Sequence, residues 1–577
     1  MAGSGEPVAG PGAWNQAPGS VGADRGGTAI GTVQYRRGPE PASQPVRLAP
    51  RPMFLVGREQ LLADVHARLT NGRTVPGPRL LALCGLGGAG KTSMAVEYAH
   101  RHLAEVAVCW QLSAEDPAVL LSEFAVLAAQ LGARDLVDSR DPVATVHAVL
   151  ARLQSAWLLI FDNVADQASI EPFIPPAGPG RVLITTQSQH WPSGQALHIP
   201  MLGAGASADF LVSRTGDTDR ATALALATEL GGLPLALEQA AAYMQATGTA
   251  MARYLPIFQT RQASLLAHGQ PAGHPVDVAA TLDLALSRLA EWDRSAASLM
   301  NVLAFLAPNP VPLIRMLTPD QPVNLPNLQI AEALGPLLDD PVTIGAAIIA
   351  LRRYSLVAPA GDGMFFVHRL VQALTRNRLT AGQAAQWRRA SVDLVKRMVP
   401  ARPDSPAAWP IATPLLPHAL AVLDLTSGDL WMIAAALGHS GNCAAARDLF
   451  RLITEAYTND VAYGPEHSNT LAARGNLARW TGEAGDAGGA RDQLAALLPV
   501  EERVLNREHP NNPITRLNLA RWTGEAGDAG GARDQLAALL PVAERVVGRE
   551  HPTTLAIRGD LARWTGESDA EDMQSGS

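Results

Sequence analysis

Apolar residues between positions 51 and 200 come in short runs, and segments with helical spacing lie between the runs. Runs of this length are typical of buried strands, and the segments between them of covering helices. The alternation predicts an α/β domain in which helices wind around a parallel sheet. The predicted strands are residues 80–84, 106–112, 157–162, 181–186 and 196–199.

The pattern becomes all-helical between residues 205 and 265, with one break at residues 231–234, Gly-Gly-Leu-Pro. Residues 276–380 are again helical and then reach a hairpin pattern. Its two strands are predicted at 356–359 and 364–367, with a glycine-containing turn between them. Helices followed by such a hairpin predict a winged helix.

The C-terminal part of the chain repeats itself. Residues 477–480, Leu-Ala-Arg-Trp, recur twice at a period of 42 residues, and a weaker copy of the unit begins at Gly441. Each unit has two helical stretches joined at a Gly-Asp-Ala turn, which predicts a solenoid of helix hairpins. A plain helical bundle, the alternative, does not explain so regular a period. The pattern resembles the 42-residue variety of tetratricopeptide repeat. Histidines at 467, 509 and 551 keep the same period, and residues 477–500 are identical to residues 519–542.

A glycine-rich loop follows the first predicted strand and fits the phosphate-binding pattern GxxxxGK[ST]. Its Lys91 is one of only two lysines in the chain, the other being Lys396. Because arginine fills the other basic positions, a lysine here indicates that this position requires a compact ammonium group. A strand, a glycine turn and a helix place backbone N–H groups around an anion. Lys91 is predicted to reach the β- and γ-phosphates, and Thr92 to bind Mg²⁺. The predicted nucleotide-binding residues are Gly85, Leu86, Gly87, Gly88, Ala89, Gly90, Lys91, Thr92 and Ser93.

Two alternatives to a phosphate-binding loop stay open. The segment is also compatible with an ordinary glycine-rich turn. In addition, Gly85, Gly87 and Gly90 spell the dinucleotide fingerprint GxGxxG, which calls for an acidic residue at the end of the second strand. That strand, residues 106–112, is followed by Ser113 instead. The dinucleotide interpretation is therefore the weaker one.

The second half of a P-loop site is an apolar strand that ends in aspartate, and residues 157–162 supply it. Asp162 is predicted to hold Mg²⁺ at the carboxyl end of its strand, although an ordinary turn or helix-capping role is the alternative. Asn163 follows, and an amide orients water but cannot accept its proton. Lys91 and Asp162 are the predicted catalytic residues of at most a slow ATPase.

From about residue 53 to 380 the chain resembles the STAND-class signalling NTPases of the NB-ARC type. Residues 54–59 resemble the motif whose backbone lies against adenine in that family, which implies nucleotide contacts for Val56, Gly57 and Arg58. Residues 181–186 resemble the family's sensor strand. The order and number of such motifs make the resemblance specific.

Two further motifs complete the resemblance. Residues 232–236, Gly-Leu-Pro-Leu-Ala, resemble the GLPL motif, which implies that Pro234 packs on the nucleotide. Residues 367–372 resemble the winged-helix motif, which implies that His368 contacts the β-phosphate of ADP. Taken singly, the first is also compatible with a helix N-terminus and the second with a core histidine.

The chain departs from the family's commonest pattern at two positions. The sensor strand usually ends in arginine, and here Gln187 follows Thr186. The histidine motif usually continues with aspartate, and here it continues with Arg369. A neutral amide does not supply charge at the γ-phosphate. The resemblance therefore implies ADP retention more directly than γ-phosphate sensing or hydrolysis.

Composition restricts the classes of function. The chain has 577 residues, of which 47% are hydrophobic and 17% charged, and its net charge is −8. This charge argues against a general nucleic-acid or membrane-surface binder, so neither partner is expected. Three cysteines without paired spacing indicate a reducing compartment. Because no signal peptide or long apolar stretch is found, a cytoplasmic protein is predicted.

The predicted organisation is a multidomain chain. The predicted domains are a disordered tail (1–50), an α/β P-loop domain (51–202), a helical domain (203–275), a winged helix (276–382), a helical linker (383–429) and tetratricopeptide-like repeats (430–577).

The predicted function is an ADP/ATP switch with Mg²⁺ in intracellular signalling. The repeats are expected to bind a protein or peptide partner, and the ATP state is expected to self-associate. The tail is too short and too poor in apolar residues for an effector domain, so a separate effector protein in trans is expected. A constitutive ATPase and a repeat scaffold with structural nucleotide are the alternatives.

Overall fold

The computed structural model describes residues 44–70, 77–132, 141–192, 194–267, 276–318, 325, 327–361, 363–505 and 511–575. The chain divides into two compact units, Met1–Gln44 and Pro45–Ser577, and the fold below is that of the second unit. Most of the predicted tail, residues 1–43, lies outside the described residues, as does His509 of the repeat pattern.

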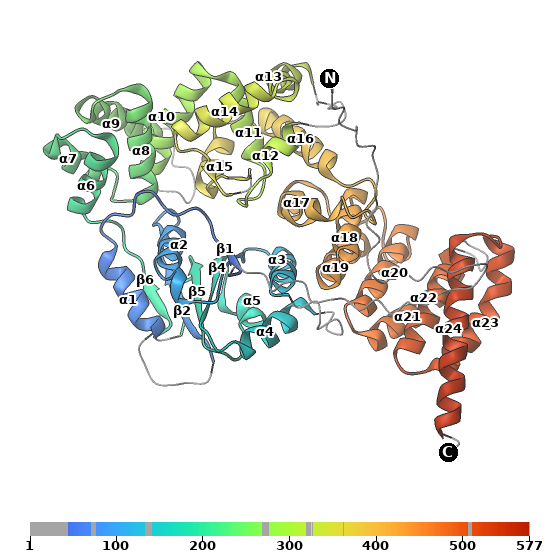
Figure 1. Cartoon of the computed structure of the whole chain (residues 1–577). Coiled ribbons are helices and arrows are strands. Elements are labelled where there is room, and N and C mark those ends of the chain that lie inside the picture. Colours follow the sequence, from blue (N-terminus) through green and yellow to red (C-terminus); the bar gives the residue numbers. More distant parts are fainter. Residues whose placement is uncertain are drawn as a thin grey trace, which may run out of the picture. The chain divides into compact units, whose positions relative to one another are not determined.

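A six-stranded parallel sheet forms the first part of this unit, in the order β1-β3-β4-β5-β2-β6 (Figure 1). Each of the five predicted strands is present. The edge strand β1 is not predicted, because two residues give no hydrophobic period. The strands are β1 (Val46–Arg47), β2 (Arg79–Cys84), β3 (Val108–Ser113), β4 (Trp157–Val164), β5 (Gly180–Thr186) and β6 (Ala196–His198).

Helices cover both faces of the sheet. Leu158 and Ile160 of β4 pack towards α1 and α2, whereas Leu159 and Phe161 pack towards α3 and α4. A strand buried on both faces is apolar at every position, which is why the runs are readable in the sequence. Polar residues are left to the strand ends. The helices are α1 (Glu59–Thr70), α2 (Lys91–Arg101), α3 (Pro117–Gln130) and α4 (Pro142–Arg152), with the short α5 (Gln167–Ile170) after β4.

Four helices follow the sheet, where the sequence predicts a helical region with one break. The predicted break before Pro234 is present, but the expectation of a single break is wrong. Gly216 and Gly248, with φ of 75° and 68°, end α6 and α8 in the left-handed conformation that glycine adopts without strain. The helices are α6 (Ala204–Thr215), α7 (Arg220–Glu229), α8 (Pro234–Thr247) and α9 (Met251–Ala267).

The next part is helical and contains the predicted hairpin. Strands β7 and β8 pair antiparallel, and Val311 bridges to Phe365 beside them. No single helix among the described residues is long and apolar enough to cross a membrane; α13 and α14 meet that test only as a pair bent by 103°. The elements are α10 (Val276–Trp292), α11 (Arg294–Leu303), α12 (Leu313–Leu317), α13 (Leu328–Asp339), α14 (Pro341–Arg353), β7 (Ala358–Pro359), β8 (Phe365–Phe366), α15 (Arg369–Asn377), α16 (Ala381–Met398) and α17 (Trp409–Val422).

The C-terminal helices stack as hairpins and share one packing device. An indole from each repeat lies against a helical glycine of the repeat before it: Trp480 on Gly438, Trp522 on Gly482 and Trp564 on Gly524. We call these three pairs the Trp–Gly ladder. The ladder includes the degenerate first copy, which is therefore a structural repeat. The helices are α18 (Gly428–His439), α19 (Cys443–Asn459), α20 (Ser468–Glu483), α21 (Ala487–Val504), α22 (Asn511–Glu525), α23 (Ala529–Val546) and α24 (Pro552–Ser575) (Figure 1).

Candidate functional site

The glycine-rich loop joins the end of β2 to the start of α2. Gly88 and Gly90 have φ of 81° and 88°, which only glycine adopts readily. Gly90 is also the N-cap of α2 and has no side chain with which to cap it. The first amide groups of α2 therefore lack a side-chain acceptor and are available to an anion.

Lys91 lies at the centre of this loop. Its side chain is buried, at 9% exposure, and its Nζ donates to the carbonyl oxygens of Gly85 (2.9 Å) and Leu86 (2.8 Å). Burial and the nearby charge of Arg369 lower the pKa of Lys91 to about 8, although Asp162 opposes the shift. Among the described residues Lys91 forms no ion pair. A buried cation without a paired anion marks a place for one.

Asp162 stands at the end of β4, where three polar side chains hold it. Thr92 and Thr185 each donate a hydroxyl hydrogen bond to Oδ1, at 2.8 Å and 2.5 Å, and Gln111 donates to Oδ2 at 3.4 Å. Thr92 is exposed, so its hydroxyl oxygen is accessible. A hydroxyl and a carboxylate are hard oxygen ligands, and Mg²⁺ usually takes one or two of these and keeps water as its other ligands.

Asn163 has an unusual backbone, with φ of 67°, at an irregularity of the β4–β5 pairing. Its backbone N–H donates to Thr185 Oγ1 at 2.8 Å, and its Nδ2 donates to Glu115 Oε2 at 2.5 Å. Glu115 follows β3, the strand next to β4. Its carboxylate therefore lies beside the side-chain amide of Asn163. The sequence carries no local signal for Glu115, because the strand register alone brings it to Asn163.

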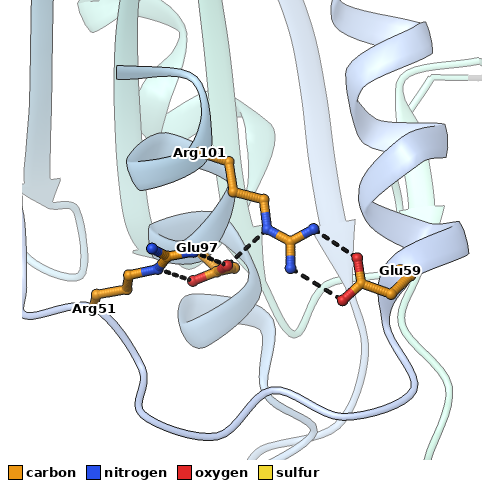
Figure 2. A network of polar contacts seen from close by, with 4 residues as sticks. All are labelled: Arg51, Glu59, Glu97 and Arg101. Carbon is orange, nitrogen blue, oxygen red and sulfur yellow. Dashed lines mark hydrogen bonds and ion pairs between the residues drawn. The ribbon is translucent and has the colours of Figure 1, made fainter. Parts of the chain in front are cut away.

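A network of ion pairs fixes the segment before α1 to the helix after the loop (Figure 2). Glu97 of α2 accepts two hydrogen bonds from Arg51, both at 2.8 Å, and one from Arg101 at 2.7 Å. Arg101 in turn donates to both carboxylate oxygens of Glu59, at 2.6 and 3.0 Å. Hydrogen bonds, first of all from Arg51, lower the pKa of Glu97 to about 2. These ion pairs therefore attach the segment to α2.

The segment between these anchors holds Val56, Gly57 and Arg58. The buried Arg58 donates to the carbonyl oxygens of Ala89 (3.1 Å) and Pro200 (2.7 Å). Gly57 has φ of 68°, and a Cβ there would lie 2.8 Å from Ala206 Cβ of α6. Arg58 therefore connects the segment to the phosphate-binding loop. Adenine contacts for these three residues stay a prediction.

Two helix N-termini lie against the glycine loop. A Cβ placed on Gly90 would be 3.8 Å from Pro234 Cγ of α8, and one on Gly88 would be 3.2 Å from Leu235 Cβ. The same position on Gly88 is 3.5 Å from Leu370 Cδ1 of α15. The GLPL segment and the histidine motif are thus both placed at the loop.

His368 is half-buried and caps α15. Its Nδ1 accepts the Leu370 backbone N–H at 3.2 Å. Burial, together with the charges of Arg369 and Lys91, lowers the pKa of His368 to about 4. The ring is therefore neutral near pH 7 and, because Nδ1 is an acceptor, carries its proton on Nε2. That N–H makes no hydrogen bond to a described residue.

The structure brings Thr92 and Asp162 together and places Arg58, Pro234 and the start of α15 against the glycine loop. Their roles stay predictions, but the geometry fits a magnesium nucleotide in three respects. The loop offers uncapped amide groups, Lys91 lacks an anion, and Thr92 and Asp162 supply oxygen ligands. Thr185, from the strand that resembles the sensor strand, and Glu115, which has no signal in the sequence, join the site.

Comparisons with known proteins agree with these observations. The tetratricopeptide repeat family model matches residues 470–511 and 514–553. A nucleotide-binding leucine-rich repeat (NLR)-like protein of Hyaloscypha variabilis is 23% identical over 387 residues, which are 60% of this chain and 37% of that protein. The chain therefore spans well under half of that relative.

Two solved structures are similar to different shares of the chain. A STAND protein with a tetratricopeptide repeat sensor from Pyrococcus horikoshii has 13% identity and a TM-score of 0.43, with 90% of this chain and 78% of that one covered. A Walker-type ATPase of Pyrococcus abyssi has 12% identity and a TM-score of 0.28, with 57% and 99% covered.

The chain has two recognisable parts. The period-42 units are tetratricopeptide repeats, and an α/β domain with a glycine loop precedes them. The chain therefore combines an α/β domain that carries a glycine-rich loop with C-terminal tetratricopeptide repeats.

Proposed function

We propose that the protein is a switch controlled by bound adenine nucleotide, with the repeats as its partner-binding part. One observation carries this proposal: the buried, unpaired Lys91 lies in an uncapped glycine loop against which α8 and α15 both pack. An anion bound there would touch three separate parts of the chain. Its presence would therefore control how those parts hold together.

Each part has a distinct task in the proposed site. The loop amides and Lys91 would bind the phosphates, and Pro234 would pack against the nucleotide. Thr92 and Asp162 would hold Mg²⁺, which when bound neutralises phosphate charge. The salt-bridge network of Glu97 would keep the Arg58 segment against α2, so that the adenine side of the site is already in place before binding.

His368 would connect α15 to the β-phosphate. Its capping bond fixes Nδ1 as the acceptor, which leaves Nε2–H as a donor for an ionised phosphate. This bond would exist only while α15 lies against the loop. Bound ADP would therefore favour the closed arrangement by the free energy of that hydrogen bond.

The open state would be reached when a protein or peptide partner binds the repeats and ADP is exchanged for ATP. Tetratricopeptide repeats offer an extended surface for such a partner. The open form would self-associate and would act through a separate effector protein. These steps make the proposed activity a population shift between two states.

A second candidate function, continuous turnover of ATP, is favoured by the Glu115 carboxylate beside Asn163. A carboxylate accepts a proton from water, which the amide of Asn163 cannot do. Steady-state phosphate release separates the two. A rate above about 1 s⁻¹ would favour the enzyme, because unassisted nucleotide switches turn over at about 10⁻⁴ to 10⁻² s⁻¹.

Replacing His368 with serine tests the link between α15 and the nucleotide. Serine still caps a helix but is too short to replace the Nε2 donor, so His368→Ser should speed ADP release without unfolding α15. The loss of one hydrogen bond to a charged group, about 1.5 kcal/mol, corresponds to release about 10-fold faster. Stopped-flow release of a fluorescent ADP measures this rate.

The repeats supply a matched control for this variant. His551 caps α24 in the same way, with Nδ1 accepting the Thr553 N–H at 3.2 Å. His551→Ser should leave ADP release unchanged. If His368→Ser also releases ADP at the wild-type rate, His368 is a structural cap and the proposed link is absent.

A further inference from the structure

A second basic side chain, Arg369, lies next to Lys91 at the start of α15. The neighbouring Leu370 packs on the glycine loop, with Cδ1 3.9 Å from the position of a Cβ on Gly87. Arg369 is close enough for its charge to lower the pKa of Lys91 and of His368. Among the described residues Arg369 makes no hydrogen bond or ion pair. The charge of Asp162 also acts on Lys91, but Arg369 has no ion-pair partner of its own in the described part of the chain.

Arg369 also lines a cavity of about 530 Å³ that begins at the carboxyl end of β3. Ser113 lies on the cavity wall and is the register partner of Asp162 in β4. Asn309, from the loop after α11, donates to Ser113 Oγ at 2.8 Å and closes this side. The cavity is thus next to the proposed magnesium site, and Arg369 is one of the residues that line it.

The acids on the cavity wall are already engaged. Glu115 accepts a hydrogen bond from Asn163, and Asp116 caps α3 by accepting the Ala118 N–H at 2.8 Å. Neither forms an ion pair with Arg369 in the described part of the chain. Arg369 is therefore a half-buried cation on the cavity wall that has no ion-pair partner among the described residues.

A neutral group, the side chain of Gln187, also lies beside the loop. Gln187, just beyond β5, places Nε2 3.7 Å from the position of a Cβ on Gly87. An amide at this place donates hydrogen bonds but brings no charge to a terminal phosphate. The residue just beyond β5 thus brings no charge to the loop, whereas α15 begins with an arginine that has no ion pair among the described residues.

We propose that Arg369 supplies the cation for the terminal phosphate of a bound nucleoside triphosphate, in place of the charge that Gln187 lacks. The inference rests on the proposed function and deepens it. A triphosphate would be held by α15 as well as by the loop. Opening would then depend on the partner of the repeats and not on the third phosphate alone.

Calorimetric binding of ADP and ATPγS to the full chain with Mg²⁺ tests this assignment. Arg369→Gln should weaken ATPγS binding about 10-fold and change ADP binding less than about 3-fold, because only the triphosphate has the extra anionic group. Adding Gln187→Arg to that variant should restore most of the ATPγS affinity, since it returns a cation to the surroundings of Gly87.

Arg388 provides the matched control, because it lines the same cavity, is exposed and has no ion pair among the described residues. Arg388→Gln should leave both affinities unchanged. Equal losses of ADP and ATPγS affinity in Arg369→Gln, or the same loss in Arg388→Gln, would overturn the assignment. No change in Arg369→Gln would also overturn it. If the wild type bound neither nucleotide, the proposed function itself would fail.

Thermal unfolding without nucleotide shows whether Arg369→Gln is folded. Should it unfold, Gln187→Arg in the wild-type background remains decisive. Arg369 already neutralises the terminal phosphate, so a second cation should raise ATPγS affinity less than about 3-fold. A gain of about 10-fold would mean that the phosphate lacks a cation in the wild type and would overturn the assignment.

Discussion

Replacing Gly482 with alanine should destabilise the repeats by about 2–3 kcal/mol, although alanine normally favours a helix over glycine. Gly482 lies in α20 under the buried indole of Trp522, and a Cβ there would be 2.3 Å from Cε2 of that ring. Either the indole must leave its position or the two helices must move apart. Urea unfolding followed by tryptophan fluorescence measures the loss.

Gly488 in α21 is the control, because a Cβ there meets nothing within 4 Å. Gly488→Ala should be neutral or stabilise the protein by up to about 1 kcal/mol. The two variants differ only in where the methyl group is added. Equal stabilities for both would mean that the Trp–Gly ladder does not hold the repeats in register.

Replacing Lys91 with alanine should weaken ADP binding by about 2–5 kcal/mol, or roughly 30- to 4,000-fold. The large effect follows from the burial of Lys91, because a desolvated ammonium interacts more strongly with phosphate than an exposed one. Titration with a fluorescent ADP measures the affinity. Unfolding without nucleotide shows whether the variant is intact.

The other lysine provides the comparison. Lys396 is half exposed and pairs with Asp429 at 3.3 Å, away from the loop. Lys396→Ala should bind ADP as the wild type does. Wild-type affinity in Lys91→Ala would instead mean that the glycine loop is an ordinary turn.

The sheet was predictable because its strands are buried on both faces. Residues such as Leu158 and Leu159 point to opposite sides, and both sides are covered, so the whole run is apolar. The phosphate-binding loop was predictable because its residues are contiguous. The repeats were predictable because each unit must present the same packing surface to its neighbour.

Other features depend on distant contacts and give no local signal. Glu115 reaches Asn163 only because β3 and β4 pair in one register and the backbone of Asn163 turns left-handed. The pairing of Arg51 with Glu97 likewise joins segments 46 residues apart. The extra helix ends at Gly216 and Gly248 were readable as glycine caps, but the high helical propensity around them hid the breaks.

The central claim is that one bound nucleotide joins the glycine loop to α15. Hydrogen–deuterium exchange of the wild-type chain, with ADP and Mg²⁺ and after nucleotide removal, tests it most directly. The account predicts that ADP slows exchange both in residues 85–93 and at the start of α15. Slower exchange in the loop alone, with α15 unchanged, would contradict the switch and leave a repeat scaffold with a structural nucleotide.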